Sequence, residues 1–219
     1  MAIQTFLTLA LAGLTRAHFG IKYPQMRGDT LSSNANESWS QWTYPCAGVP
    51  SNLTDKPITP WPLDGGSLKL DLHHPWTYIF VNLGLGSDAA NFNYTLTQPF
   101  WNSTGNGTLC VSRLELPDDL PVRDGSPATL QVVTLGEDGN ALYNCADIVF
   151  REDAEVLSED ECQTSEGVTY APVAVATDND GDNTAGGDKD GAGSALTVNT
   201  LALSSVVGLV MVFVASLSV

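Results

Sequence analysis

The chain has 219 residues, with 9 basic and 25 acidic side chains and a formal net charge of −16 at pH 7. This negative balance argues against binding to nucleic acid and favours the attraction of cations. The apolar content of 43% permits a packed core, and the length fits one domain with additional segments at its ends.

The first 17 residues have the pattern of a secretory signal peptide. An apolar stretch over residues 6–14 is followed by Thr15-Arg16-Ala17, which fits a small-x-small cleavage site, although the start lacks the usual positive charge. Cleavage after Ala17 makes His18 the first residue of the mature protein, with a free α-amine. An N-terminal histidine can chelate one metal ion through its amine and its own imidazole, which no internal residue can do. We therefore expect His18 to be a metal ligand.

Residues 21–163 have the pattern of β-structure. The segment 68–72 alternates apolar and polar side chains, as a half-buried strand does, and the runs 78–83, 130–135 and 148–150 are rich in β-branched and aromatic residues. Turn signals separate these runs, namely Asp64-Gly65-Gly66, Pro99, Asp124-Gly125 and Glu137-Asp138-Gly139-Asn140. Short strands at this spacing predict an all-β sandwich over residues 18–165.

His73 and His74 are the only other histidines, and they follow the strand 68–72 directly. Pro75 favours an extended conformation at His74. Adjacent residues on an extended chain point to opposite faces, so we expect only one of the two to face His18. A histidine pair by itself is more often a surface feature than a site. Combined with an N-terminal histidine it predicts a copper site, because copper prefers imidazole and amine nitrogens.

Four cysteines lie inside the predicted domain, and an even number in an exported protein indicates two disulfides. A zinc site is disfavoured because the chain has no C-x-x-C pair. The cysteines are Cys46, Cys110, Cys145 and Cys162, and the sequence leaves three connectivities open. Export is also indicated by five N-x-[ST] glycosylation sequons, at Asn36, Asn52, Asn93, Asn102 and Asn106.

The composition changes twice towards the C-terminus. Residues 166–195 lose hydrophobic periodicity and are acidic, which predicts a flexible stalk, and the Asp-rich run 178–182 lacks the frame of a calcium loop. Residues 196–219 are apolar and end without a basic residue. Small residues around Gly191 precede this tail. We therefore predict a GPI anchor attached at Gly191 with removal of the tail, and a single membrane span is the alternative.

Signals for other chemistry are weak. A serine hydrolase is not indicated because no G-x-S-x-G turn occurs, and Gly84-Leu85-Gly86 has no following helix that would make it a nucleotide loop. The tryptophans could either fill a sandwich core or stack on sugars, and the sequence does not separate these roles. They are Trp39, Trp42, Trp61, Trp76 and Trp101.

Several motifs resemble, in the same order, those of one fungal protein family. They are His18-Phe19, Tyr23-Pro24, Arg27, Trp42-Thr43-Tyr44-Pro45-Cys46, Pro62-Leu63-Asp64-Gly65-Gly66, the segment from His74 to Leu85-Gly86, Asn91-Phe92-Asn93 and Leu142-Tyr143-Asn144-Cys145-Ala146-Asp147. Over residues 18–165 the chain is similar to the copper acquisition factors, which are GPI-anchored proteins similar to lytic polysaccharide monooxygenases.

The resemblance implies an immunoglobulin-like or fibronectin-like β-sandwich that holds one copper ion in a histidine brace. The implied ligands are the His18 amine and imidazole, the imidazole of His74 in preference to His73, and the carboxylate of Asp147. It also implies a monomer at the extracellular face of the cell membrane, or in the cell wall, that captures copper and passes it to a membrane copper importer.

Asp147 also bears on the kind of activity expected. A carboxylate ligand stabilises Cu(II) and occupies coordination space, which favours holding copper over activating oxygen. The competing hypothesis is a copper-dependent monooxygenase that cleaves polysaccharide, and a third is a cell-wall interaction protein whose copper is incidental. Of the three disulfide connectivities we favour Cys46–Cys145 with Cys110–Cys162.

Overall fold

The structure is a computed structural model, and it describes residues 18–33, 35–136 and 139–174. The predicted signal peptide, most of the predicted stalk, Gly191 and the apolar tail lie outside the described residues. No α-helix occurs in the described ranges, so none of them contains a helix that could cross a bilayer.

The described part of the chain contains ten strands. They are β1 (Phe19–Tyr23), β2 (Ile58–Pro62), β3 (Gly66–Leu72), β4 (Trp76–Leu85), β5 (Tyr94–Thr95), β6 (Trp101–Thr104), β7 (Gly107–Leu114), β8 (Pro127–Leu135), β9 (Ala141–Arg151) and β10 (Thr169–Pro172). The predicted strands 68–72, 78–83, 130–135 and 148–150 fall within β3, β4, β8 and β9. Of the predicted turns, 64–65, Pro99 and 124–125 lie between strands, and Gly66 begins β3.

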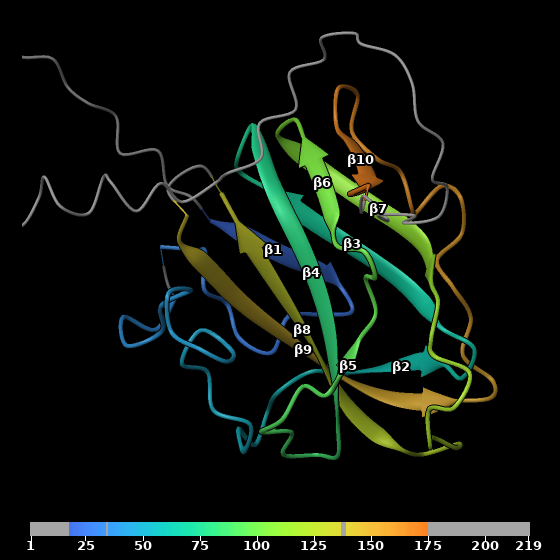
Figure 1. Cartoon of the computed structure of the whole chain (residues 1–219). Helices are drawn as coiled ribbons and strands as arrows, with labels where there is room; N and C mark the ends of the chain where they lie inside the picture. Colours follow the sequence, from blue (N-terminus) through green and yellow to red (C-terminus); the bar gives the residue numbers. More distant parts are fainter. Residues whose placement is uncertain (1–17, 34, 137–138, 175–219) are drawn as a thin grey trace, which may run out of the picture. The chain divides into compact units, whose positions relative to one another are not determined.

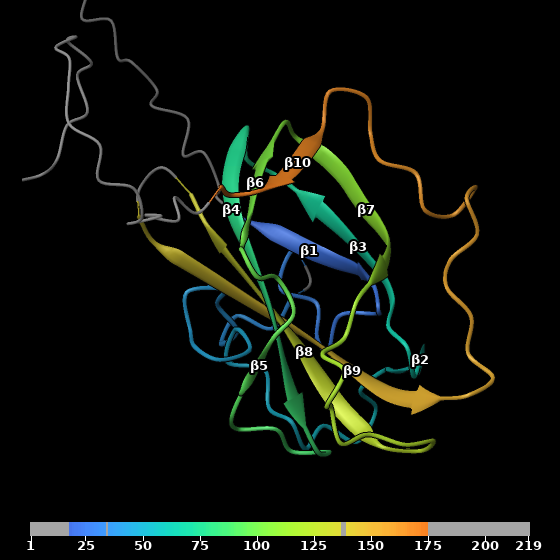
Figure 2. The same ribbon diagram turned by 45° about the vertical axis from the view of Figure 1, so that its right-hand side comes forward.

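The strands form two sheets that pack as a sandwich (Figure 1). The smaller sheet has the order β1-β3-β7, and these three strands lie side by side in Figure 2. The larger sheet has the order β10-β6-β4-β8-β9-β2, with the short β5 paired to β4. Most neighbours are antiparallel, whereas β2 runs parallel to β9. The predicted all-β sandwich is confirmed.

The core lies between the inward faces of the two sheets. Strand β3 shows how the sequence places it there, because its leucines point inward while Lys69 and Asp71 point outward. Each apolar side chain of this size that is fully buried stabilises the fold by about 1.5–3 kcal/mol. The largest fully buried apolar side chains are Trp61, Phe19, Phe150, Leu68, Leu70, Leu72, Ile79, Leu83, Leu109, Leu130 and Ile148.

The structure places two of the five tryptophans in the core. Trp61 and Trp101 belong to the core, with exposed fractions of 0% and 8%. Trp39 and Trp76 are half-buried, and Trp42 is 48% exposed. Core packing therefore accounts for only part of the tryptophan content.

Two disulfides attach long irregular segments to the sheets. Cys46–Cys145 joins the segment between β1 and β2 to β9, and Cys110–Cys162 joins the segment between β9 and β10 to β7. Both favoured pairings are confirmed. They span 99 and 52 residues, and cross-links over such lengths stabilise a fold by about 4–5 kcal/mol each if loop-closure entropy dominates.

The domain extends beyond its predicted end at residue 165. Strand β10 pairs antiparallel with β6 and forms an edge of the larger sheet. Residues 169–172, predicted as the start of the stalk, therefore belong to the sandwich. Their side chains are all exposed, so this edge strand lacks the apolar alternation that would have revealed it.

Candidate metal centre

The pairing of β1 with β3 brings His18 to the histidine doublet. Phe19 lies opposite Leu72 in this antiparallel pair. One residue further, the backbone N–H of His73 donates to the carbonyl of His18 at 3.3 Å. Residues opposite one another in such a pair have Cα atoms about 4.5–5.5 Å apart. His18, the predicted mature N-terminus, therefore lies opposite His73, the first residue of the doublet.

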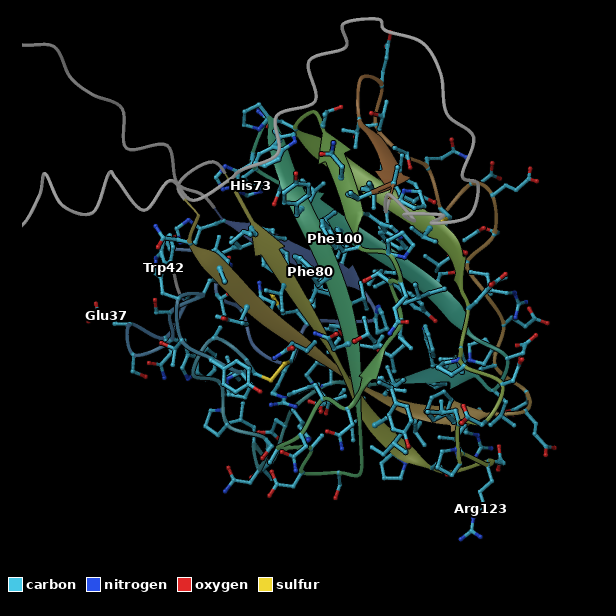
Figure 3. All side chains as sticks on the ribbon, viewed as in Figure 1. Glu37, Trp42, His73, Phe80, Phe100 and Arg123 are labelled. Atoms are coloured by element: carbon cyan, nitrogen blue, oxygen red, sulfur yellow. A yellow bond between two sulfur atoms is a disulfide. The ribbon has the colours of Figure 1, made fainter. Side chains whose placement is uncertain are left out.

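The two histidines of the doublet have different surroundings. The Nε2 atom of His73 lies 3.4 Å from Oδ2 of Asp71, which also pairs with Lys22 at 3.1 Å on the outward face of β3. The ring of His74 lies beside Gly136, which directly follows β8 of the other sheet. A Cβ atom added to Gly136 would be 3.8 Å from Cε1 of His74. Figure 3 labels His73 at this end of the sandwich. The doublet thus splits between the outer face and the opposite sheet, as strand alternation predicts.

The Asp71 carboxylate is ionised and holds His73 on the outer face of the sheet. Partial burial raises the pKa of the Asp71 carboxyl, but the hydrogen bond and charge of Lys22, together with His73, lower the pKa to a net value below its ordinary one. A carboxylate that already accepts from Lys22 and lies against His73 makes His73 the less suitable partner for His18.

Two buried amides hold the backbone immediately after His18. Gln41 accepts from the Phe19 N–H through Oε1 at 3.1 Å and donates through Nε2 to the Phe19 carbonyl at 2.9 Å. Asn144 of β9 donates through Nδ2 to the same carbonyl at 2.8 Å. Thr30 connects the two amides by hydrogen bonds of 2.8 and 3.0 Å. The edge of β1 that does not face β3 is therefore fixed by side chains.

Sequence reasoning missed both amides as positioning residues. Gln41 and Asn144 are each 1% exposed. Asn144 occupies an inward-facing position between Leu142 and Ala146, and a polar residue at such a position was the one available signal. Gln41 lies in the irregular segment between β1 and β2, where no periodicity indicates which side chains are buried.

Asp147 belongs to a separate buried cluster. Its carboxylate accepts two hydrogen bonds from Arg27, from Nε at 2.7 Å and Nη2 at 2.9 Å, and one from the Thr129 hydroxyl at 2.8 Å. The Lys56 ammonium lies 3.4 Å away. Burial alone would raise the pKa of the Asp147 carboxyl, but Arg27, Thr129 and Lys56 together hold the pKa below its ordinary value. Asp147 is therefore an ionised partner of two cations.

The structure does not bring Asp147 to the histidines, which corrects the predicted ligand set. Asp147 pairs with Thr129 near the start of β8, whereas the His74 ring lies beside Gly136 after its end. The seven residues from 129 to 136 correspond to about 23 Å of extended strand. In the described ranges, no three side chains of His, Cys, Asp or Glu are grouped to hold a metal ion. Of the predicted ligands, His18 is the one that the strand pairing brings next to the histidine doublet.

The donors at this end of the sandwich fit copper in kind. Once His18 is N-terminal, its α-amine, its imidazole and the imidazole of His74 supply three nitrogen donors, which suit Cu(II) and Cu(I) better than the oxygen-preferring cations. The buried amides behind Phe19 fix the direction in which His18 leaves β1.

The chain matches the model of the BIM1-like copper acquisition factor family over residues 16–167. It is 32% identical over 200 residues to the lytic polysaccharide monooxygenase-like protein X325 of Aspergillus fumigatus, which covers 78% of this chain and 82% of that protein. It is 36% identical over 165 residues to the lytic polysaccharide monooxygenase-like protein ham-7 of Neurospora crassa, covering 68% and 71% of the two chains. Copper acquisition factor BIM1 of Cryptococcus neoformans is 30% identical over 177 residues, with 74% and 73% covered. The chain therefore belongs to the BIM1-like copper acquisition factor family, and its function is related to copper.

Proposed function

We propose that the mature protein captures one copper ion through a histidine brace and delivers it for uptake at the cell surface. The brace consists of the His18 α-amine, the His18 imidazole and the His74 imidazole. The backbone pairing of His18 with His73 supports this proposal, because His18, the expected first residue after cleavage, lies next to the doublet. Membership of the copper acquisition factor family supplies the identity of the metal.

Asp147 has no part in the proposed site. Its oxygens accept hydrogen bonds from Arg27 and Thr129 and lie near Lys56. The expectation that a carboxylate of Asp147 fills the coordination sphere of copper therefore no longer argues against oxygen activation. Capture and delivery are instead supported by the family and by the predicted GPI anchor, which would keep the protein next to a membrane importer. Glu137 and Asp138 follow Gly136 in the sequence and lie outside the described residues. Copper titration of the variants Glu137→Gln and Asp138→Asn tests whether one of these carboxylates is a further ligand of the copper ion.

The test of the brace is Cu(II) titration of the processed protein, monitored by electron spin resonance. Protein that begins at His18 is expected to bind one ion tightly. A version that retains Ala17 has its histidine nitrogen in an amide bond, and we expect its affinity to fall by more than the roughly 100-fold that loss of a group supporting a ligand can cost. Equal affinities of the two versions would exclude an amine ligand.

The competing function is oxidative cleavage of polysaccharide, which the names of several relatives suggest. Copper-loaded protein is incubated with a reductant and oxygen or peroxide on chitin, cellulose and β-glucans, and we expect no oxidised oligosaccharides. Their release would overturn the transport proposal. Growth and copper content of a deletion strain under copper limitation then distinguish copper delivery from a structural role in the cell wall.

The proposed location has its own test. Phosphatidylinositol-specific phospholipase is expected to release the protein from membranes of the producing cells. Detection of the intact 196–219 segment in the mature protein would instead support the single-span alternative.

A further inference from the structure

Four aromatic rings form a continuous stripe on the outer face of the larger sheet. Trp76, Tyr78 and Phe80 alternate along β4 with buried neighbours, and Phe100 directly precedes β6. The ring centroids are 4.8 Å apart for Trp76–Tyr78, 5.0 Å for Tyr78–Phe100 and 4.7 Å for the stacked pair Phe80–Phe100. Figure 3 labels Phe80 and Phe100 next to each other. All four rings are half-buried, so the stripe offers an aromatic surface to a group attached close to it.

The sequon residue Asn102 lies on the same face as this stripe. In β6 it pairs with Tyr78 on one side and with Ala171 of β10 on the other. Residues directly opposite in a sheet point to the same face, with Cβ atoms about 4.5–5.5 Å apart. The Asn102 side chain is exposed, whereas its neighbours Trp101 and Ser103 are buried.

Phe100 is the second close neighbour of Asn102. Residues two apart along an extended chain share a face, and the pairing of the β6 segment with β10 continues to Phe100, whose carbonyl accepts from the Val173 N–H at 2.9 Å. Asn102 therefore stands between Phe100 along its own chain and Tyr78 on the adjacent strand. A group attached to its amide nitrogen begins at the edge of the stripe.

We propose that Asn102 is N-glycosylated and that the first N-acetylglucosamine of its glycan packs on the rings of Tyr78 and Phe100. The sequence Asn102-Ser103-Thr104 is an acceptor sequon. A pyranose ring presents an apolar face of C–H groups, and the negative faces of aromatic rings attract such weakly positive groups. Covalent attachment keeps the sugar at a high effective concentration over the stripe. The proposal requires export through the secretory pathway and is independent of copper binding.

Asn52 provides the matched control. It is also an exposed sequon residue, but it lies in the irregular segment before β2. The surface hollow beside it is lined by Ser51, Leu53, Lys56, Ser87 and Asp88, and none of its described lining residues is aromatic. A glycan at Asn52 is therefore expected to remain in solvent and to contribute little to stability.

The test compares the full-length gene product, expressed through the secretory pathway of a eukaryotic host and released from its membranes, with N102Q and N52Q variants. Peptide mass spectrometry is expected to show that Asn102 is occupied. N102Q is expected to lower Tm by about 2–4 °C and N52Q by less than about 1 °C. Trimming the wild-type glycans to a single N-acetylglucosamine with endoglycosidase H should leave Tm unchanged, because that first sugar makes the contact. An unoccupied Asn102, or equal shifts for the two variants, would overturn the proposal.

The F100L variant separates the sugar contact from a general effect of the substitution. It keeps an apolar side chain but removes the flat ring. In the F100L background, N102Q is expected to cause a clearly smaller fall in Tm than in the wild type. An undiminished fall would show that the glycan, if present, does not pack on Phe100.

Discussion

The Asp147 cluster and the histidine end of the sandwich use polar side chains in opposite ways. At Asp147, two cations and a hydroxyl surround one carboxylate whose side chain is only 5% exposed. Near the histidines, buried amides instead hold the backbone of β1, and the histidines lie at the ends of strands. The first arrangement stabilises the fold, and the second positions donors at the rim. A carboxylate inside a family motif can therefore be structural even though its residue type suits a metal.

Asp147→Asn is expected to cause the largest loss of stability. It leaves Arg27 and Lys56 buried beside a neutral group, and removing one partner of a buried ion pair costs about 3–5 kcal/mol of unfolding free energy. Urea denaturation measures this loss. The control is Asp71→Asn, whose side chain is 25% exposed and whose pairs should contribute about 1 kcal/mol or less. Reduced copper affinity of folded D147N with unchanged stability would restore Asp147 as a ligand.

The same carboxylate makes stability depend on pH. Its pKa is lower in the folded protein than in the unfolded chain, so its contribution is fully present above the ordinary aspartate value of about 3.9 and is lost as the pH falls through the folded pKa. We expect the unfolding free energy of the wild type to fall in this acid range. The fall should be shallower in D147N, although Asp29 and Asp71 also have lowered pKa values and still contribute. Identical acid profiles would contradict the assigned cause.

The histidine end is tested by His74→Ala beside His73→Ala. Loss of the His74 imidazole is expected to weaken Cu(II) binding by about 100-fold, whereas His73→Ala should have little effect because Asp71 engages its ring on the outer face. Copper titration of both processed variants measures the difference. The opposite order of effects would assign His73 as the ligand.

The smallest effect is expected from the amides behind the N-terminus. Gln41→Leu removes both hydrogen bonds that Gln41 makes with Phe19. We expect copper affinity to fall by about 10-fold, as for other groups that orient a metal ligand. Gln131→Leu, which removes a buried amide bonded to Pro45 and Asn82 instead, is the control and should not alter affinity. An equal loss in both variants would indicate a general effect of buried amides.

Local patterns in the sequence determined the strands, the turns and the histidine at the predicted cleavage site. Alternation along 68–72 and the glycine turn at 64–66 act over a few residues, so they can be recognised without knowing the fold. The motifs at His18, Cys46 and Cys145 carried the family resemblance, which the family match confirms.

Only the tertiary structure decided which of these residues meet. Arg27 lies 120 residues from Asp147, and Asn144 lies 125 residues from Phe19. Such pairs are determined by how whole strands pair and pack. The sequence around one partner therefore gives no information about which distant residue it will contact. The same reason explains why Asp147 suited a copper ligand by residue type yet lies with Arg27, and why only pairing with β6 identified β10 as a strand.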